Sequence, residues 1–243
     1  MLIKFYDLLF LKEKVNGVIH IGAHELEELQ DYLKVNVNRI IWIEANPEKY
    51  DLINKKIESF PNMTLGKFAA GRTNDIQYLN LANNRQSSSI LDLGTHKINY
   101  PKINYDAKIK VEIKSLDDWL ENNFANRYLY NFLNIDIQGY ELEALKGMKN
   151  HLFLIDYIYM EVNLEQVYSG CAELNEIDDF LLKFGFNRVA IKKTKKGWGD
   201  ALYSKNNIFV YRFYYGFILK LKNLPKITYY FLHRLFRKFV KKS

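Results

Sequence analysis

Short apolar runs alternate along the chain with segments of helical hydrophobic spacing, and this alternation restricts the fold more than any other feature. We expect strands at residues 17–21, 39–44, 63–69, 131–136 and 157–162. A helix follows most of these runs, which is typical of a mostly parallel sheet with helices on both faces. The sequence therefore predicts an α/β, Rossmann-like, doubly wound sheet.

Capping residues mark the starts of two of these helices. Asn46 is a natural N-cap and Pro47 suits the first helical position, while Pro61 ends the pattern. Ser115 with Asp118 resembles a capping box at the start of another helix.

The end of the sheet and one long connection also have sequence signals. After a helix over residues 175–184, the segments 186–193 and 201–204 indicate a hairpin that closes the sheet. Polar residues 83–106 form one long connection, and connections of that length are usually functional or disordered.

Composition and charge divide the chain into two parts. Its 243 residues are 48% hydrophobic and 26% charged, as expected for one folded domain with an appendage. We expect that domain at residues 1–205 and a basic, aromatic, amphipathic helical tail at 206–243. Ten Lys or Arg and no acidic residue follow position 200, so the first 200 residues are slightly acidic. The net charge of +7 comes from the tail, so it bears on the location of the protein in the cell and not on the ligand of its pocket.

Location follows from the cysteine count and the apolar segments. The single Cys171 excludes an internal disulfide framework and a cysteine-cluster zinc site, which favours a reducing, cytoplasmic compartment. Residues 1–14 resemble an amphipathic helix rather than a secretory signal. The longest apolar stretch, residues 208–219, contains Arg212 and is shorter than the roughly 20 residues that span a bilayer. We expect no transmembrane helix.

Carboxylates crowd the segment after the first expected strand. Gly22 permits a tight turn there, but the G-x-G-x-x-G fingerprint of dinucleotide-binding proteins is absent. Glu25, Glu27 and Glu28 fall in the first turn of the expected helix, where they would repel a pyrophosphate and attract an ammonium or sulfonium. This disfavours NAD and favours S-adenosylmethionine. The alternative is that these glutamates only complement the helix dipole.

Two further strand ends suit that cofactor. Glu44 ends the second strand, where an acidic side chain can accept hydrogen bonds from both hydroxyls of a ribose. Ala69, Ala70 and Gly71 follow the third strand and would let the backbone approach a flat adenine, although small residues also occur there for packing.

At this point the chain resembles a known family, the FkbM-type methyltransferases of the S-adenosylmethionine-dependent class I fold. The matching motifs, over about residues 15–205, are VIHIGAHELEE at 18–28, IIWIEANP at 40–47, RQSSSILDLGTHKINYP at 85–101, LNIDIQGYELEALKGM at 133–148, and the segment from YMEVNLEQVYSGC to GWGDALY. Members are typically O-methyltransferases that act on sugar hydroxyls. The resemblance therefore implies that this chain methylates a sugar in a surface glycan, a glycolipid or a nucleotide-sugar precursor.

The strand ends and the resemblance together indicate three groups of site residues. Cofactor contacts are expected from His20, Gly22, Ala23, Glu27, Glu44, Asn46, Ala69, Ser88 and Asp136. Catalytic candidates are His96, Asp136 and Glu161, because methyl transfer to a hydroxyl needs alignment and a proton acceptor. Acceptor contacts are expected from Ser89, His96, Asn163 and Trp198. We favour His96 or Asp136 as the base; His96 as a surface residue and Trp198 as a packing residue are the alternatives.

The motifs depart from the common family pattern at three places. His20 stands where many members have Asp, and His24-Glu25-Leu26 stands where they have Asn-x-Gly. His20 either orients the methionine end of the cofactor, with Glu27 supplying the charge, or is a core histidine. Gln138 replaces a frequent Glu, which weakens the case for a metal site at Asp136.

A magnesium ion is an alternative that the residue types allow. Asp136, Glu161 and Asn163 offer the oxygen ligands that Mg²⁺ prefers, but their spacing is not diagnostic.

The tail suggests a partner. In residues 225–243 apolar and aromatic side chains share one helical face and basic side chains the other, which is typical of a helix that lies on an anionic membrane. We expect a peripheral protein on the inner face of the membrane. Packing on the catalytic domain or homo-oligomer formation is the second interpretation, and a nucleic-acid-binding protein or RNA methyltransferase is the third, which the acidic body disfavours.

Removal of residues 225–243 tests the membrane interpretation. Because the basic charges and the apolar face are lost together, we expect the truncated protein to stop cosedimenting with anionic vesicles while it still methylates a soluble sugar acceptor. Loss of turnover after truncation would instead make the tail a structural part of the enzyme.

Overall fold

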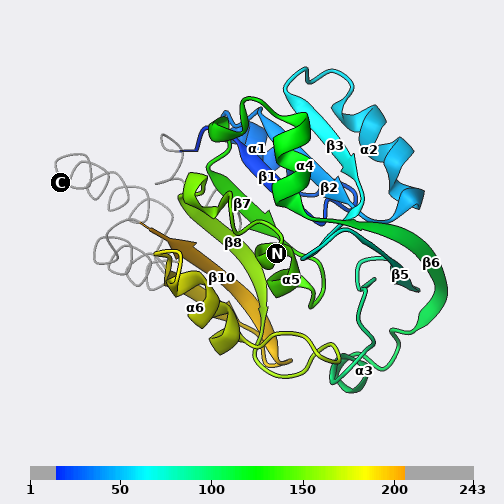
Figure 1. The fold of residues 1–243 in the computed structure, drawn as a ribbon. Helices are drawn as coiled ribbons and strands as arrows, with labels where there is room; N and C mark the ends of the chain where they lie inside the picture. The colour runs from blue at the N-terminus through cyan, green and yellow to red at the C-terminus, as the bar shows by residue number, and fades with distance from the viewer. Residues whose placement is uncertain (1–14, 206–243) are drawn as a thin grey trace, which may run out of the picture.

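Seven strands form the central sheet of the structure, a computed structural model that describes residues 15–205. Their order across the sheet is β3-β2-β1-β7-β8-β10-β9 (Figure 1). The strands are β1 (Val18–Ile21), β2 (Ile40–Glu44), β3 (Met63–Lys67), β7 (Phe132–Ile135), β8 (Tyr157–Asn163), β9 (Asn187–Lys193) and β10 (Trp198–Ser204). Neighbours pair in parallel except β10, which is antiparallel to β8 and β9. The doubly wound α/β sheet predicted from the sequence is confirmed.

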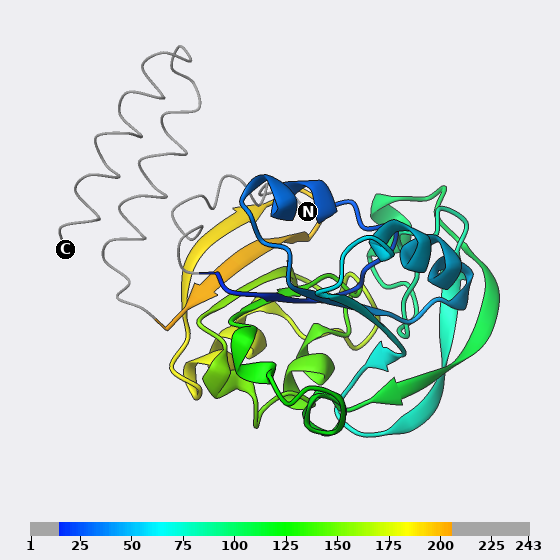
Figure 2. The ribbon, with the colours of Figure 1, turned by 90° about the horizontal axis from the view of Figure 1, so that it is seen from above.

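Helices cover both faces of this sheet. The helices are α1 (Leu29–Lys34), α2 (Tyr50–Ile57), α3 (His96–Asn99), α4 (Leu116–Asn123), α5 (Glu141–Lys146) and α6 (Leu174–Leu182), with short 3-10 helices at Pro47–Lys49, Arg127–Leu129 and Leu152–Leu154. Seen along the sheet, α1 and α2 lie on one side and α4, α5 and α6 on the other (Figure 2).

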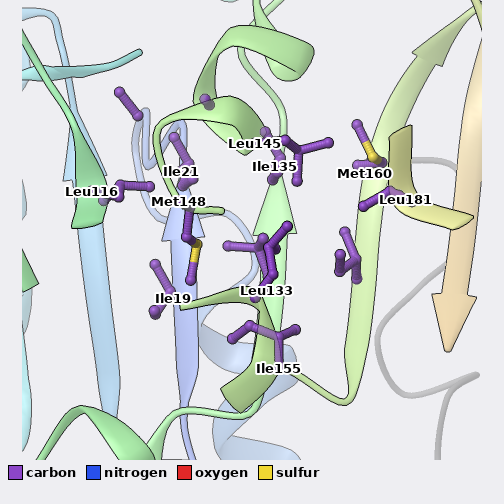
Figure 3. Packing of buried hydrophobic residues seen from close by; sticks show 14 of the residues in the cluster. Ile19, Ile21, Leu116, Leu133, Ile135, Leu145, Met148, Ile155, Met160 and Leu181 are labelled. Atoms are coloured by element: carbon purple, nitrogen blue, oxygen red, sulfur yellow. The ribbon is translucent and has the colours of Figure 1, made fainter. Parts of the chain in front are cut away.

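Two apolar layers hold the helices to the sheet. Because side chains alternate along a strand, Ile19 and Ile21 face the layer under α4, α5 and α6, where Leu133 and Leu145 also pack (Figure 3). On the opposite face, Trp42 is fully buried under α1 and α2. Each fully buried side chain of this kind contributes about 1.5–3 kcal/mol of transfer free energy. The buried strands explain why the apolar runs are continuous rather than alternating.

A second, smaller sheet was missed by the sequence interpretation. It consists of β4 (Ala69–Ala70), β6 (Tyr105–Lys114) and β5 (Asp75–Ala82), in that order. Part of this sheet is buried on one face only, so the apolar residues of β6 alternate with charged ones, and Ile76 and Tyr78 near the start of β5 are exposed. Residues 79–82 at the end of β5 are buried on both faces. The alternation of apolar with polar or charged residues in β5 and β6 adjoins the polar connection 83–106. In the sequence these strands therefore resemble more of that connection.

The other expected elements lie close to their predicted positions. The run 63–69 is divided into β3 and β4, and the expected hairpin is β9 and β10. The long connection lies between β5 and β6 and contains the four-residue helix α3.

Of the two predicted helix N-caps, one forms the expected hydrogen bond and the other does not. Asn46 caps its helix as expected, since its side-chain oxygen accepts a hydrogen bond from the backbone N–H of Glu48 at 3.0 Å. Ser115 occupies the N-cap position of α4, but its hydroxyl makes no cap hydrogen bond. It donates to the carbonyl of Gly147 at 3.0 Å instead. The capping box was therefore wrong, because a tertiary hydrogen bond takes the hydroxyl.

The helix expected at residues 1–14 and the tail at 206–243 lie outside the described residues. Among the helices of residues 15–205, none has the length and apolar character needed to cross a membrane.

Gly147 is a packing point that a single methyl group would disturb. Its carbonyl also accepts a hydrogen bond from the backbone N–H of Asp117, and an added Cβ would collide with the carbonyl of Gly71. We expect Gly147→Ala to lower the free energy of unfolding by about 1–3 kcal/mol, the usual effect of overpacking. Urea denaturation measures this, and a change below about 0.5 kcal/mol would mean that the backbone shifts freely here.

Candidate functional site

Two adjoining cavities open at the carboxyl ends of the parallel strands. The first cavity is lined by the end of β2, by β4 and by part of the connection between β5 and β6. The second cavity, of about 380 Å³, is lined by the turn after β1, by α3 and by the end of β8. Five residues line both cavities: Gly22, His24, Gln86, Asp136 and Gln138. This shared wall is where a ligand in one cavity would meet a ligand in the other.

Most of the predicted site residues line these cavities. The first cavity holds Gly22, Glu44, Asn46, Ala69, Ser88, Ser89 and Asp136. The second cavity holds His20, Gly22, Glu27, His96, Asp136, Glu161 and Trp198. Ala23 and Asn163 are buried and are not in the lining of either cavity.

Glu44 is held by the backbone on both sides of its carboxylate. One oxygen accepts a hydrogen bond from the N–H of His24 and the other from the N–H of Asn46, both at 2.7 Å. Burial raises the pKa of Glu44, against the effect of these hydrogen bonds. Each carboxylate oxygen keeps further acceptor capacity, which a pair of vicinal hydroxyls can use.

The turn after β1 has a left-handed backbone at three positions. Gly22 has φ +92°, and a Cβ there would collide with the carbonyl of Asp136. His24 and Leu26 have φ values of 44° and 61°. At these two positions the family that the sequence resembles commonly has Asn and Gly. Those residue types adopt this conformation most easily. In this chain His24 is held by Glu27 instead, and Leu26 is buried.

The three glutamates of this turn have different surroundings. They precede α1 rather than forming its first turn, because the left-handed residues delay the helix to Leu29. Glu25 pairs with Lys49 at 2.5 Å, and Glu27 accepts from the His24 ring at 2.6 Å. Only Glu27 and Glu28 line the second cavity. Although burial opposes ionisation, the hydrogen bond from His24 lowers the pKa of Glu27 to about 2.

His20 is both a buried residue and part of the cavity wall. Asn134 donates to the hydroxyl of Tyr32 at 2.6 Å, which leaves the hydroxyl proton for Nδ1 of His20 at 2.9 Å. Nε2 of His20 lies 4.0 Å from a carboxylate oxygen of Glu28. Burial lowers the pKa of His20 to about 4, so the ring is neutral at physiological pH.

Asp136 follows β7 directly and is held by a side-chain network that the sequence interpretation missed. Gln138 donates to Asp136 at 2.7 Å, and the Tyr168 hydroxyl donates to the amide oxygen of Gln138. The replacement of Glu by Gln at position 138 was the available signal, because an amide can donate where a carboxylate cannot. Tyr168 had no comparable signal.

Glu161 lines the second cavity beside Asp136. Burial, reinforced by the charges of Asp136 and Glu141, raises the pKa of Glu161 well above its ordinary value. Burial also raises the pKa of Asp136, against the hydrogen bond that Gln138 donates to it. The described residues contain no group of three His, Cys, Asp or Glu side chains placed to hold a metal ion. The magnesium alternative therefore has no support.

His96 lies in α3 among aromatic rings. Its ring centroid is 4.8 Å from that of Tyr100 and 5.3 Å from that of Tyr168. Nδ1 is buried without a partner, which leaves Nε2 as the nitrogen that can reach the cavity. Burial, together with the charge of Lys196, lowers the pKa of His96, so the ring is an unprotonated base at neutral pH. Trp198 donates to the Tyr100 hydroxyl at 3.0 Å, so it both packs and lines the cavity.

The two predicted serines hold the long connection in place. Ser88 donates to the carbonyl of Arg85 at 2.8 Å. Ser89 donates to the carbonyl of Gln138 at 2.7 Å and lies in the first cavity, whereas an acceptor contact was expected. The structure therefore places Ser89 beside the expected cofactor contacts and not with His96.

Comparison with known proteins agrees with this geometry. The family model of the methyltransferase FkbM domain matches residues 20–188. The chain belongs to this family. A crystal structure of the methyltransferase FkbM from Methylobacillus flagellatus has a similar fold, with a TM-score of 0.50, 15% identity, and coverage of 77% of this chain and 43% of that chain.

Two curated relatives match part of the chain. The 2-O-methyltransferase NoeI of Sinorhizobium fredii is 32% identical over 98 residues, which cover 40% of each protein. The hexuronic acid methyltransferase AglP of Haloferax volcanii is 25% identical over 122 residues, which cover 49% of this chain and 45% of AglP. The chain thus spans less than half the length of either relative.

Glu141 gives the loop of this site a pH dependence. Its buried carboxylate accepts hydrogen bonds from the N–H groups of Ile137 and Gly139, and burial raises its pKa to about 7 from an ordinary value of 4.5. The folded protein therefore binds a proton that the unfolded chain releases near pH 4.5. Stability from this group is full below pH 4.5 and is lost as the pH rises towards 7.

We expect Glu141→Gln to remove this contribution. As the pH rises from 5 to 7.5, the unfolding free energy of the variant should increase relative to that of the native protein. Urea denaturation across that range measures it, and a difference independent of pH would show that Glu141 is ionised throughout.

Proposed function

We propose that the protein is an S-adenosylmethionine-dependent O-methyltransferase that acts on a sugar hydroxyl. The observation that carries the proposal is the pair of adjoining cavities, with Glu44 in the first, His96 in the second and Asp136 in their shared wall. Family membership supports methyl transfer, and the names of NoeI and AglP support a sugar acceptor.

The first cavity has the features that the nucleoside of this cofactor needs. The carboxylate of Glu44 is fixed by two backbone N–H groups and would accept hydrogen bonds from both ribose hydroxyls. Ala69 and Ala70 leave a flat space for adenine. Gly22 lets the turn after β1 pass close to Asp136, whose carboxylate would attract the positively charged end. When bound, the cofactor supplies a methyl group on a sulfonium.

The second cavity would hold and deprotonate the acceptor. Nε2 of His96 would take the hydroxyl proton, which is supported by the lowered pKa of the ring and by its contacts with the rings of Tyr100 and Tyr168. Glu161, whose pKa burial raises well above its ordinary value, would in its protonated form donate a hydrogen bond to a sugar oxygen. Asp136 was the other candidate base; its place in the shared wall suits cofactor binding better.

The wider setting is also part of the proposal. The acceptor would be a sugar of a surface glycan, a glycolipid or a nucleotide-sugar precursor, reached at the inner membrane face through residues 225–243. No Lys or Arg side chain among the described residues lines the second cavity. This argues against an RNA acceptor, whose phosphates would need cations there.

Titration with S-adenosylhomocysteine tests the cofactor assignment. We expect micromolar binding by calorimetry and at least a roughly tenfold loss in Glu44→Gln, because charge-assisted hydrogen bonds to the ribose are weakened. Glu48→Gln is the matched control, since this exposed carboxylate lies outside both cavities. No binding by the folded native protein would overturn the enzyme proposal. An equal loss in both variants would remove Glu44 from the ribose contact.

A further inference from the structure

The second cavity has a one-sided charge. Four carboxyl groups line it, those of Glu27, Glu28, Asp136 and Glu161, and no Lys or Arg side chain of the described residues does. Glu161 is not counted as a charge, because burial raises its pKa well above its ordinary value. Histidines do not compensate fully, because burial keeps His20 and His96 neutral at physiological pH and His24 is paired with Glu27.

Two basic side chains of the described residues near the cavities have partners outside the second cavity. Nζ of Lys196 lies 3.8 Å from the ring centroid of Tyr100 and donates to the carbonyl of Asn99 at 3.1 Å. Arg85 lines the first cavity and pairs with Glu48 and Asp106. Neither side chain is in the lining of the second cavity.

The remaining lining is suited to a sugar ring without charge. Aromatic side chains of Tyr100, Tyr168 and Trp198 offer flat apolar surface, while Asn84 and Ser87 offer hydrogen-bonding groups. The buried Nδ1 of His96 has no protein partner. This part of the wall therefore contains a polar atom that can gain a hydrogen bond when a ligand binds. S-adenosylhomocysteine, which has no sulfonium, brings one ammonium and one carboxylate at its amino-acid end and leaves the negative balance unchanged.

We infer that the acceptor ring entering the second cavity carries no anionic group: it is a neutral or amino-bearing hexopyranose, and neither a hexuronate nor a ring phosphorylated near the reacting hydroxyl. This rests on the proposed function and deepens it. A ring carboxylate would be buried beside Asp136 and Glu28 with no cation to pair with, and such burial is strongly unfavourable. A ring ammonium would gain from the same groups.

Binding of three matched glycosides tests this. The protein is saturated with S-adenosylhomocysteine, and the methyl glycosides of glucose, glucosamine and glucuronic acid are titrated while ligand-observed NMR records binding. We expect the first two to bind and the glucuronide to bind at least roughly tenfold more weakly, the effect of one like-charge contact at partly screened distances. Equal or tighter binding of the glucuronide overturns the inference, and so does absence of binding by all three.

Two variants connect the result to the cavity. Glu28→Gln removes one carboxylate from the lining, so we expect it to reduce the difference in affinity between the glucoside and the glucuronide. Glu121→Gln, an exposed position on α4, is the control and should leave this difference unchanged. If the native protein and Glu28→Gln show the same difference in affinity between the two glycosides, the carboxylates do not determine the preference for an uncharged ring. Binding of S-adenosylhomocysteine is measured in the same samples, so failure of the cofactor assignment is seen separately.

Discussion

The carboxylate of Glu44 joins the turn after β1 to the turn after β2. It accepts one backbone hydrogen bond from the turn after β1 and one from the turn after β2. A buried carboxylate is unfavourable without such donors, so both turns must present their N–H groups to it. That requirement sets the left-handed backbone at His24, which in turn places Glu27 and Glu28 at the second cavity rather than in a helix. The arrangement of both cavities thus depends on this one anchor.

The acids of the site differ in protonation because their neighbours differ. Glu27 is ionised because His24 and backbone groups donate to it. Asp136 receives a hydrogen bond from Gln138, whose own orientation is fixed by Tyr168. Glu161 has Asp136 and Glu141 as like-charged neighbours, which favour its neutral form. A glutamate at position 138 would add another like charge to this group. The amide found there adds no charge, and its hydrogen bond lowers the pKa of Asp136 against the larger effect of burial, which raises it.

Sequence reasoning located the parts of the site that lie directly on the sheet. Glu44 and Asp136 follow buried parallel strands, and the rule that such strand ends meet at one edge is geometric, so their convergence was predictable. His24 and Tyr168 were not, because their roles depend on local backbone angles and on loops brought together from distant segments. The strands β5 and β6 were missed for a different reason. Much of β6 and the first half of β5 are exposed on at least one face, and their polar and charged residues resemble a polar connection.

The same long connection is held to the rest of the fold at two places, which fixes the position of His96. Backbone N–H groups of Gly94, Thr95 and His96 donate to the carbonyls of Gln166 and Val167 at 2.9–3.1 Å. Ser89 fastens the other end of the segment to the loop after β7. His96 is therefore held by hydrogen bonds on its own backbone and by contacts with the rings of Tyr100 and Tyr168. A side chain held in this way loses little conformational entropy when a ligand enters the second cavity, which is the condition under which a residue of a long connection can align a bound molecule.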